Sequence, residues 1–441
     1  MVIVSSFGFR ASDVSIAVFK DVLLTQGIPF MAGKATVAII GGGIAGLAAA
    51  YHLKKKNVDC VLYEKNAEVG GRFSTCAVEG VYINRGALMF CPASNPCFSE
   101  LIGQLGIDYE HIQMSRFALQ IGERLIALNQ WSLLKSGLFS LADFIQWFRL
   151  KRFLRSLDFD FAHPDERLRA WHDVSLLEFC RRNLKLGTAL IDYLVQPFSS
   201  FAYVDPDELS ADYGLFLLSY SVTPCAAIRK GMGEVALRIK NSLPETVAVN
   251  SRVSKVTYEA SKGFMIEQAG KEGDGTGKPR MEGPYAYCIF ATGRRNVKNL
   301  MADIDFAVFG SKTRGVIFET VAPRYRPFEL LIFPKAGNTH GVHGGEIRHL
   351  PDGRSVCGMF LHRPDGDLGA VFDNVRVIER VGWSPAISVA QPGSQCVDVT
   401  TAVPKAFVVG DFFRFPSLES CAFTAKKVAG IIAQENTTAG S

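Results

Sequence analysis

The stretch that decides the fold is Ala35-Thr-Val-Ala-Ile-Ile40, then Gly41-Gly-Gly-Ile-Ala-Gly46, then Leu47-Ala-Ala-Ala-Tyr-His-Leu-Lys-Lys-Lys56. The first part is a short apolar run rich in β-branched residues, which is typical of a strand buried on both faces of a parallel sheet. The last part has good helix formers and a basic final turn that suits the negative end of a helix dipole. The sequence therefore predicts a strand from Thr36 to Ile40, a glycine turn and a helix.

The glycines of this turn follow the G-x-G-x-x-G spacing at Gly41, Gly43 and Gly46. The first glycine of such a turn permits the tight bend, the second lets the backbone approach a pyrophosphate, and the third allows helix and strand to pack closely. Ile44 and Ala45 open the helix, whose free N–H groups would face the pyrophosphate. The turn therefore predicts a nucleotide-binding site.

A second predicted strand, Asp59-Cys-Val-Leu-Tyr63, leads into Glu64 and Lys65. A carboxylate at this point can accept hydrogen bonds from both ribose hydroxyls and would repel a 2′-phosphate. A glycine triplet alone also occurs in ordinary turns, but this one follows a strand, opens a helix and is closed by an acidic residue. The unit therefore favours a dinucleotide without a 2′-phosphate.

A second glycine pair follows in Glu68-Val-Gly-Gly-Arg-Phe-Ser74. Gly70 and Gly71 let the backbone pass close to another part of the ligand, and Arg72 can neutralise a phosphate or pack beside a flavin. The combination of V-x-I-I-G-G-G-I-A-G-L-A-A-A, Y-E-K and V-G-G-R resembles the N-terminal signature of the flavin amine oxidase, protoporphyrinogen oxidase and phytoene desaturase superfamily. The resemblance implies that this glycine pair and its arginine lie along non-covalently bound FAD.

Three later segments resemble the same superfamily in the required order. They are Val247-Ala-Val-Asn-Ser-Arg-Val-Ser-Lys-Val256, Tyr285-Ala-Tyr-Cys-Ile-Phe-Ala-Thr-Gly293 and Ala406-Phe-Val-Val-Gly-Asp-Phe-Phe-Arg-Phe-Pro-Ser-Leu-Glu419. The resemblance places the first beside the adenine and makes the second a strand ending in an A-T-G turn. It makes the third a strand, a G-D turn and a helix start near the flavin, where a positive helix end stabilises the charge on reduced flavin. The FAD contacts implied here are Val253, Ala291, Thr292, Gly410, Asp411, Ser417 and Leu418.

The residues after the second glycine pair depart from the family pattern. Many relatives carry an aspartate in a D-x-G run where this chain has Ile83-Asn-Arg-Gly86, so Asn84 is given no catalytic role. Contacts with the isoalloxazine edge are still expected from Arg85 and from the stretch Leu88, Met89 and Phe90. The catalytic acid or base stays unassigned.

The resemblance implies an α/β fold with a Rossmann-like FAD-binding domain of the glutathione-reductase type and a discontinuous α+β substrate domain. The FAD-binding domain is expected at residues 31–115, 225–300 and 395–435, and the substrate domain at 116–224 and 301–394. Residues 1–30 stand apart: either they are an added element, or the true start is Met31. Helical spacing from Leu133 to Phe153 and from Ser175 to Asn183 predicts a cap over the flavin. Short β-type runs such as Gly315–Val321 and Phe328–Phe333 predict the floor of the substrate pocket.

Two positions in the expected substrate domain are candidates for substrate contact. Trp383 precedes an apolar run much as a tryptophan does in several relatives, and could form an aromatic wall or a core residue. Arg314, with Lys312, lies near the position where some amine oxidases hold a lysine beside flavin N5 through a water. His340-Gly-Val-His343-Gly-Gly-Glu346 has metal-ligand residue types, but its glycine-broken context predicts no metal site.

Composition limits the partners and the compartment. The net charge of +5 is small for 441 residues and forms no long basic runs, so nucleic acid is not expected as a partner. Ten scattered cysteines without C-x-x-C pairs, and no apolar run long enough to span a membrane, predict a cytosolic, reduced protein. Leu134–Arg152 mixes aromatic and basic residues, but such a stripe is more often a core face, so peripheral membrane contact is possible and not favoured.

The resemblance implies an FAD-dependent oxidoreductase in which hydride moves from an amine or a hydrophobic C–N or C–C substrate to flavin N5. Oxygen is the expected electron acceptor. Two alternatives stay open, a carotenoid- or porphyrinogen-like desaturase and a catalytically silent flavoprotein that serves as a binding module. The substrate and the oligomeric state are not encoded in any motif of the sequence.

Overall fold

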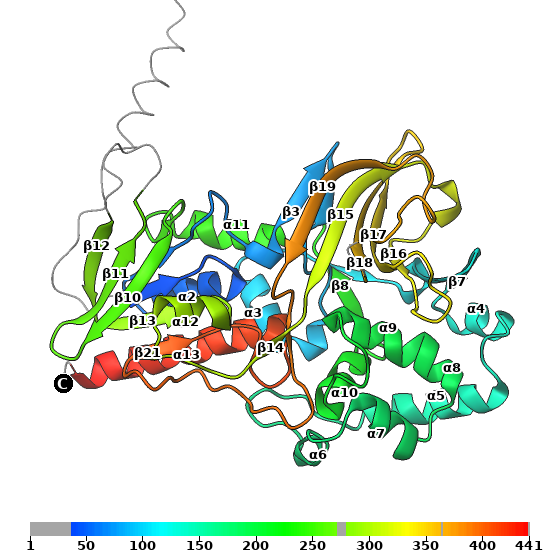
Figure 1. Ribbon diagram of the computed structural model, residues 1–441, viewed down its shortest axis with the longest axis horizontal. Helices are drawn as coiled ribbons and strands as arrows, with labels where there is room; N and C mark the ends of the chain where they lie inside the picture. The colour runs from blue at the N-terminus through cyan, green and yellow to red at the C-terminus, as the bar shows by residue number, and fades with distance from the viewer. Residues whose placement is uncertain (1–36, 271–278, 363–364, 440–441) are drawn as a thin grey trace, which may run out of the picture. The chain divides into compact units, whose positions relative to one another are not determined.

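The computed structural model describes residues 37–270, 279–362 and 365–439 of the chain (Figure 1). The possible extension at residues 1–30 lies outside the described residues. Figure 1 shows a parallel sheet and a second, larger sheet, each built from segments far apart in the chain, and a group of helices from one continuous stretch.

Five short strands, all parallel, form the first sheet in the order β21-β13-β1-β2-β9. Their bounds are β1 Val37–Ile40, β2 Cys60–Tyr63, β9 Val247–Ala248, β13 Tyr287–Phe290 and β21 Ala406–Val408. The central strand β1 is buried throughout, as its unbroken apolar run predicts. Parallel strands leave their carboxyl ends at one edge of the sheet, so the turns that follow β1, β2, β13 and β21 come together there.

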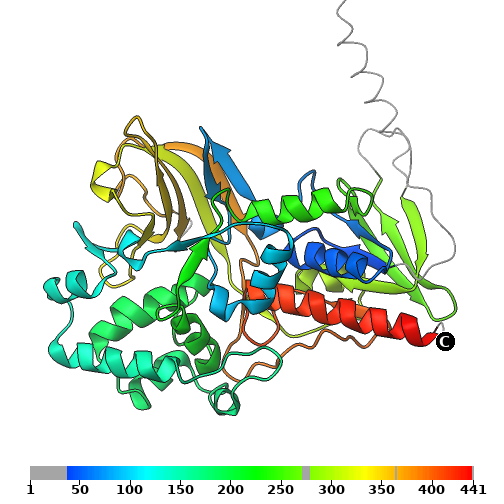
Figure 2. The same cartoon turned by 180° about the vertical axis from the view of Figure 1, so that it is seen from behind.

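Each face of this sheet is covered by a different layer. Val37 and Ile39 join one core with helices α2, α3, α11 and α13, whereas Ala38 and Ile40 join another with the antiparallel sheet β10-β11-β12 and helix α12. Figure 2 shows α11, α2 and α13 running side by side across the first face. The bounds are α2 Ile44–Lys55, α3 Pro96–Gln104, α11 Gly233–Ser242, α12 Arg294–Leu300, α13 Leu418–Ala439, β10 Val253–Glu259, β11 Gly263–Gln268 and β12 Arg280–Tyr285.

The larger sheet has seven strands in the order β19-β15-β18-β17-β16-β6-β7. Neighbouring strands are antiparallel except β16 and β6, which run parallel with Leu330 opposite Phe117. The bounds are β6 Phe117–Ile121, β7 Arg124–Ala127, β15 Thr313–Thr320, β16 Leu330–Ile332, β17 Val342–His349, β18 Ser355–Leu361 and β19 Arg376–Trp383. Strands β15 and β16 fall on the two predicted runs, and the sheet packs over a core that contains Phe318, Leu331 and Met359.

The third part is helical and has its own core of leucine and phenylalanine side chains. Its helices are α4 Gln130–Lys135, α5 Leu141–Leu154, α6 Glu166–Ala170, α7 Leu176–Arg182, α8 Thr188–Leu190, α9 Gln196–Ser199 and α10 Ala211–Ser219. The helix expected from Leu133 to Phe153 is two helices. It breaks because Gly137 adopts a φ of +70° and Ser140 starts α5 with a capping box to Asp143.

Short pieces complete the described structure. They are the hairpin β3 Thr75–Val78 and β4 Val81–Asn84, the pair β5 Glu110–Ile112 and β8 Cys225–Ala227, and the pair β14 Phe309–Gly310 and β20 Ser388–Val389. Among the helices that the structure describes, none combines the length and the apolar character needed to cross a bilayer.

Candidate functional site

A cavity of about 1060 Å³ lies at the carboxyl edge of the parallel sheet. The turns after β1, β2, β13 and β21 line it, together with the seven-stranded sheet and the helices α9 and α10. Small-molecule pockets are commonly about 300–1,000 Å³, so this cavity is large. The glycine turn that starts at Gly41 and the turn at Gly410 and Asp411 line the same cavity although they lie far apart in the sequence.

The glycine turn has the geometry that its spacing predicts. Gly41 has a φ of +111°, and a Cβ there would lie 2.7 Å from the carbonyl oxygen of Ala291. A Cβ on Gly46 would lie 2.0 Å from the carbonyl oxygen of Gly41, so close packing of α2 on the turn requires glycine. Gly43 differs, because a Cβ there would meet nothing within 4 Å and the residue lines the cavity. Gly43 also precedes α2 without a side-chain cap, which leaves first-turn N–H groups at the cavity edge near Ile44 and Ala45.

Glu64 is held in place by backbone donors. Its Oε2 accepts a hydrogen bond from the Gly42 N–H at 2.8 Å, and its Oε1 accepts one from the Asn66 N–H at 2.9 Å. A carboxylate offers about four acceptor positions, so this buried group keeps capacity for further donors. Glu64 and Lys65 both line the cavity.

The second glycine pair docks on the first turn. Gly70 and Gly71 have φ values of +109° and +55°, and the Gly70 N–H donates to the Gly42 carbonyl at 2.8 Å. These conformations are the left-handed ones that glycine adopts without strain. The pair thereby brings Arg72 into the cavity wall.

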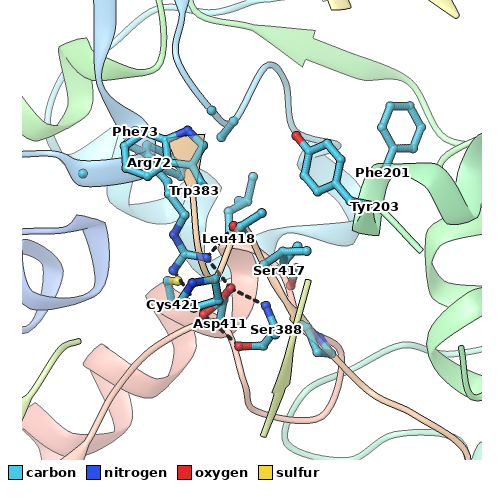
Figure 3. Close-up of a pocket in the computed structure, with 18 of the residues that line it drawn as sticks. Arg72, Phe73, Phe201, Tyr203, Trp383, Ser388, Asp411, Ser417, Leu418 and Cys421 are labelled. Carbon is cyan, nitrogen blue, oxygen red and sulfur yellow. Dashed lines mark hydrogen bonds and ion pairs between the residues drawn. The ribbon is translucent and has the colours of Figure 1, made fainter. Parts of the chain in front are cut away.

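Arg72 and Asp411 join the two ends of the chain across the site. Arg72 donates to both Asp411 carboxylate oxygens, from Nη1 at 2.6 Å and from Nη2 at 3.2 Å, and from Nη1 to the Ala386 carbonyl at 2.8 Å. Asp411 also accepts from the Ser388 N–H at 2.9 Å and from Ser388 Oγ at 3.2 Å. Figure 3 shows this network at the base of the open space. Burial alone would raise the pKa of Asp411, but the Arg72 charge and the hydrogen bonds hold it below its usual value.

Helix α13 starts at the cavity. Ser417 and Leu418 line it, whereas the buried Glu419 turns away and accepts hydrogen bonds from the Cys97 and Phe98 N–H groups at 2.8 and 3.0 Å. Ser420 Oγ donates to the Gly410 carbonyl at 2.8 Å. The turn and the helix start are therefore fixed to each other.

One part of the cavity is almost wholly apolar. Its lining comes from the segment after Gly86, from the start of β6 and the turn before it, from the residue after β7, from α9 and the turn after it, from α10, and from β16. These residues include Leu88, Met89, Met114, Phe117, Leu128, Phe198, Phe201, Leu217, Leu330 and Ile332. Among the described residues that line the cavity, the carboxylates are Glu64 and Asp411, and neither belongs to the apolar part. In the apolar part of the cavity, a bound ammonium group would therefore meet no carboxylate of the described residues.

Tyr203 and His343 bring polar atoms to this apolar part. Tyr203 has a left-handed φ of +58°, and its ring centroid lies 5.6 Å from that of His343 and 5.5 Å from that of Phe360. Figure 3 shows Tyr203 across the open space from Trp383. Burial lowers the pKa of His343 to about 3, and its Nδ1 lies 3.3 Å from Nε2 of His362. His343 is therefore neutral at neutral pH.

Several residues expected at the site lie elsewhere. Phe90 is fully buried in the core against Phe98, and Val253 on β10 lies outside the cavity lining. Arg314 does not line the cavity, whereas Lys312 does. Arg85 also lies outside the lining, because its guanidinium binds Glu379 and the Thr75 carbonyl. Val253 belongs to β10 and Arg85 follows the β3–β4 hairpin, so the way these strands pair sets where the two residues lie.

The other expected residues do line the cavity. Ala291 and Thr292 follow β13 there, and Trp383 lies at the end of β19 with its indole N–H donating to the Arg85 carbonyl at 2.7 Å. Sequence reasoning missed Phe73, Phe201, Tyr203 and Cys421. No local pattern marks them, and the side chain of Tyr203 reaches the cavity through a backbone conformation that its residue type does not predict.

Glu346, in the segment from His340 to Glu346, and Asn84 are bonded to each other and to other residues of the protein. Glu346 accepts hydrogen bonds from the Asn84 backbone and side chain and pairs with Arg348. Asn84 Oδ1 in turn accepts from the Met232 N–H at 2.7 Å. Among residues 37–270, 279–362 and 365–439, no three His, Cys, Asp or Glu side chains are grouped so that they could hold a metal ion.

Residues 44–306 match the family model described as flavin containing amine oxidoreductase. Protoporphyrinogen oxidase 2 of Arabidopsis thaliana is 26% identical over 257 residues, which is 56% of this chain and 47% of that protein. Coproporphyrinogen III oxidase of Bacillus subtilis is 31% identical over 202 residues, which is 40% of this chain and 39% of that protein. The matched region thus spans about half or less of these curated relatives.

Two solved structures show the same fold over nearly the whole chain. A putative protoporphyrinogen oxidase from Exiguobacterium sp. 255-15 superposes with a TM-score of 0.67 and 17% identity, covering 92% of this chain and 100% of that one. Cyclohexylamine oxidase from Brevibacterium oxydans gives a TM-score of 0.65 and 15% identity, covering 91% and 99%. The match over more than half of the sequence shows that the chain belongs to the flavin-containing amine oxidoreductase family.

Proposed function

We propose that the protein is an FAD-dependent oxidoreductase acting on a hydrophobic substrate that carries no positive charge. The FAD would be bound non-covalently in a Rossmann-like domain of the glutathione-reductase type, formed by residues 31–115, 225–300 and 395–435. Residues 116–224 and 301–394 would form the substrate domain. The observation that carries the proposal is the single cavity lined by both the glycine turn and the Gly410–Asp411 turn.

The residues at the carboxyl edge of the parallel sheet fit a dinucleotide. Gly43 leaves open space where a side chain would intrude, and α2 presents N–H groups without a side-chain cap, which suits a pyrophosphate. Glu64 retains acceptor capacity for ribose hydroxyls. Arg72 and the start of α13 at Ser417 and Leu418 would adjoin the flavin half.

When bound, FAD would supply an acceptor for hydride from a substrate C–H bond. The protein itself would bind, orient and exclude water. Arg72 and Asp411 would keep the Gly410 turn closed against the cofactor, and the large apolar lining would desolvate the substrate. Trp383 and Tyr203, on opposite sides of the open space, would set the orientation of the substrate between them.

The apolar lining favours one substrate class over another. A charged amine bound in the apolar part would lose its hydration without a carboxylate partner there, at a cost of several kcal/mol. An extended apolar or neutral C–C or C–N substrate loses little on transfer to the same surface. The relatives named as a porphyrinogen oxidase and as a carotenoid 3,4-desaturase from Haloarcula japonica are consistent with this class. Oxygen is the electron acceptor that we propose.

The visible spectrum of the purified protein tests the proposal. We expect a flavin absorbance that passes into the supernatant after acid or heat denaturation, because the cofactor is not covalently attached. Under anaerobic conditions, an apolar polyene or a neutral cyclic substrate should bleach this absorbance, and primary amines protonated at neutral pH should not. A colourless protein that does not bind added FAD would contradict the cofactor assignment, and bleaching by charged amines alone would contradict the substrate class. A flavoprotein that stays oxidised with every candidate would support the silent binding module instead.

A further inference from the structure

Helices α4 and α5 expose a cluster of large apolar side chains. Among the described residues, twelve large hydrophobic side chains are exposed, and five of them fall within residues 131–148. These five form the α4–α5 apolar cluster: Trp131 at 73% exposure, Leu134 at 51%, Leu141 at 77%, Ile145 at 49% and Phe148 at 66%. Single exposed apolar residues are ordinary, but this concentration on two consecutive helices indicates an interaction surface.

The three residues of the cluster on α5 do not lie on the core face of that helix. Leu141, Ile145 and Phe148 follow an i, i+4, i+7 spacing and so share one side of α5. Leu150 and Leu154 lie on the opposite side, where they are buried in the core of the helical part. The sequence favoured an ordinary core face for this stretch, but the structure shows two apolar faces, and only one of them is covered by the described chain.

The charged side chains in the stretch of sequence that contains the cluster are mainly positive. Residues 129–155 contain five basic side chains, Lys135, Arg149, Lys151, Arg152 and Arg155. The one carboxylate in this stretch, Asp143, is engaged in the capping box with Ser140. Lys151 Nζ lies 4.4 Å from the ring centroid of Trp147 and 4.6 Å from that of Phe148, so cationic and aromatic groups share one surface.

This combination fits the interface of an anionic bilayer. Aromatic and aliphatic side chains enter the boundary between headgroups and acyl chains, while Lys and Arg meet lipid phosphates. A second copy of the chain is a poorer match, because a symmetric contact would bring two basic surfaces together. Figures 1 and 2 both place α4 and α5 at the outer edge of the helical part.

The cluster also begins where the apolar part of the cavity ends. Leu128 lines the cavity, α4 starts two residues later at Gln130, and Trp131 is the most exposed residue of that helix among the large apolar ones. A surface docked at this point would lie beside the apolar lining.

We propose that the α4–α5 apolar cluster docks the protein on the surface of a bilayer that contains anionic lipid. The cluster inserts its apolar side chains into the interfacial layer, and the surrounding basic residues bind lipid phosphates. The inference rests on exposure and charge alone and stands whether or not the proposed redox function is correct.

Co-flotation of the full-length, flavin-loaded protein tests the proposal, with phosphatidylcholine vesicles that contain or lack phosphatidylglycerol. The protein should float with the anionic vesicles, and less so in high salt or with phosphatidylcholine alone. The double variant Leu141→Ser/Phe148→Ser should lower partitioning by about tenfold or more. Arg149→Gln/Arg152→Gln should reduce binding to anionic vesicles only. Leu237→Ser removes a leucine of α11 that is 51% exposed and lies outside the cluster, and this variant should bind like the unchanged protein.

Tryptophan quenching gives a second readout that does not depend on activity. Brominated lipid in anionic vesicles should quench Trp131 fluorescence, and Trp131→Phe should lose that part of the quenching. Failure of the unchanged protein to float with anionic vesicles would overturn the proposal. So would a concentration-dependent dimer that the double variant abolishes while lipid binding stays the same, because the cluster would then be an interface between copies of this chain.

Discussion

Glu64 is oriented before any ligand arrives, because two backbone N–H groups bind its two carboxylate oxygens. Such prior ordering lowers the entropic cost of binding a ribose. The same contacts tie the start of α2 to the end of β2, so the side chain has a structural role beside its proposed binding role.

Replacement of Glu64 by alanine is expected to weaken FAD affinity by about tenfold to a hundredfold, since hydrogen bonds to a charged group contribute about 1.5–3 kcal/mol. Isothermal titration of the flavin-stripped protein with FAD measures the effect. Glu68→Ala, at an exposed position in the same loop, serves as the control. An unchanged affinity in the Glu64 variant would show that the carboxylate does not contact the cofactor.

Gly43 and Gly46 give a matched pair of substitutions. Gly43→Ala should leave the unfolding free energy of flavin-free protein nearly unchanged, because its Cβ meets nothing within 4 Å, and should lower FAD affinity about tenfold. Gly46→Ala should instead destabilise the flavin-free protein by about 1–3 kcal/mol, because its Cβ would lie 2.0 Å from the Gly41 carbonyl oxygen. Urea unfolding and FAD titration separate the two effects. Equal loss of stability in both variants would argue against the distinct roles of these glycines.

At the scale of elements, helix α13 connects the cavity with the first helical layer. Its first turn lines the cavity, and the Glu419 carboxylate accepts hydrogen bonds from the N–H groups of Cys97 and Phe98 at the start of α3. Burial raises the pKa of Glu419, while these backbone hydrogen bonds and the Cys97 side chain oppose the rise. The carboxylate therefore replaces the side-chain cap that Asn95 does not provide to α3.

Truncation of this side chain tests the link between the two helices. Glu419→Ala would leave two N–H groups at the start of α3 without their partner and is expected to cost about 2–4 kcal/mol of unfolding free energy. Glu419→Gln should cost less, because the amide oxygen still accepts one of the two bonds. Chemical denaturation of both variants measures the difference. Equal and small effects would mean that water replaces the carboxylate.

The elements that local signals specify were predictable from the sequence. The strand, glycine turn and helix at residues 36–56 carry their periodicity and turn chemistry within one short stretch, and β1 and α2 fall there. The division of the helical part was less predictable, because a single left-handed glycine at position 137 and the cap at Ser140 interrupt an otherwise continuous pattern. No strand was expected between residues 116 and 224, so the prediction missed β6, which pairs with β16 across more than two hundred residues.

In the candidate site, too, local sequence signals made some residues predictable and left others out. Residues in glycine-rich or acidic turns were predictable because their chemistry requires those residue types. Tyr203 and Phe201 were not, since ordinary aromatic residues reach the cavity only through tertiary packing. The sequence marked His343 only as a residue of metal-ligand type. It could not show that His343 lies beside His362, because that histidine is on another segment of the chain.

On the scale of the whole molecule, one histidine of the helical part bonds both to a carboxylate of α10 and to a distant loop. His172 places Nδ1 2.9 Å from Asp212 Oδ2 and Nε2 2.5 Å from the Ser394 carbonyl oxygen. Both partners are acceptors, so both ring nitrogens must carry protons, and the hydrogen bond to Asp212 raises the pKa of His172 to about 9.

The sign of the pH effect follows from this raised pKa. In the unfolded chain the imidazole has its ordinary pKa near 6.5. The folded state therefore holds the proton more tightly, and the contribution to stability is complete below about pH 6.5 and disappears as the pH rises through about 9. Because the side chain is about a quarter exposed, screening limits the contribution to about 1–2 kcal/mol. Thermal unfolding between pH 6.5 and 9.5 should show a decline that His172→Gln lacks; equal slopes in both proteins would show that this contact does not titrate there.

The order of the strands in the parallel sheet has a consequence for biosynthesis. Strand β21 lies at the sheet edge beside β13. The turn that follows it contains Asp411, which pairs with Arg72, a residue more than three hundred positions earlier in the chain. While a ribosome is still translating the residues that precede this turn, the nascent polypeptide lacks one wall of the cavity. A stop codon before the turn would yield a product without the Asp411 carboxylate that pairs with Arg72, and we expect such a product to leave the cavity open on that side.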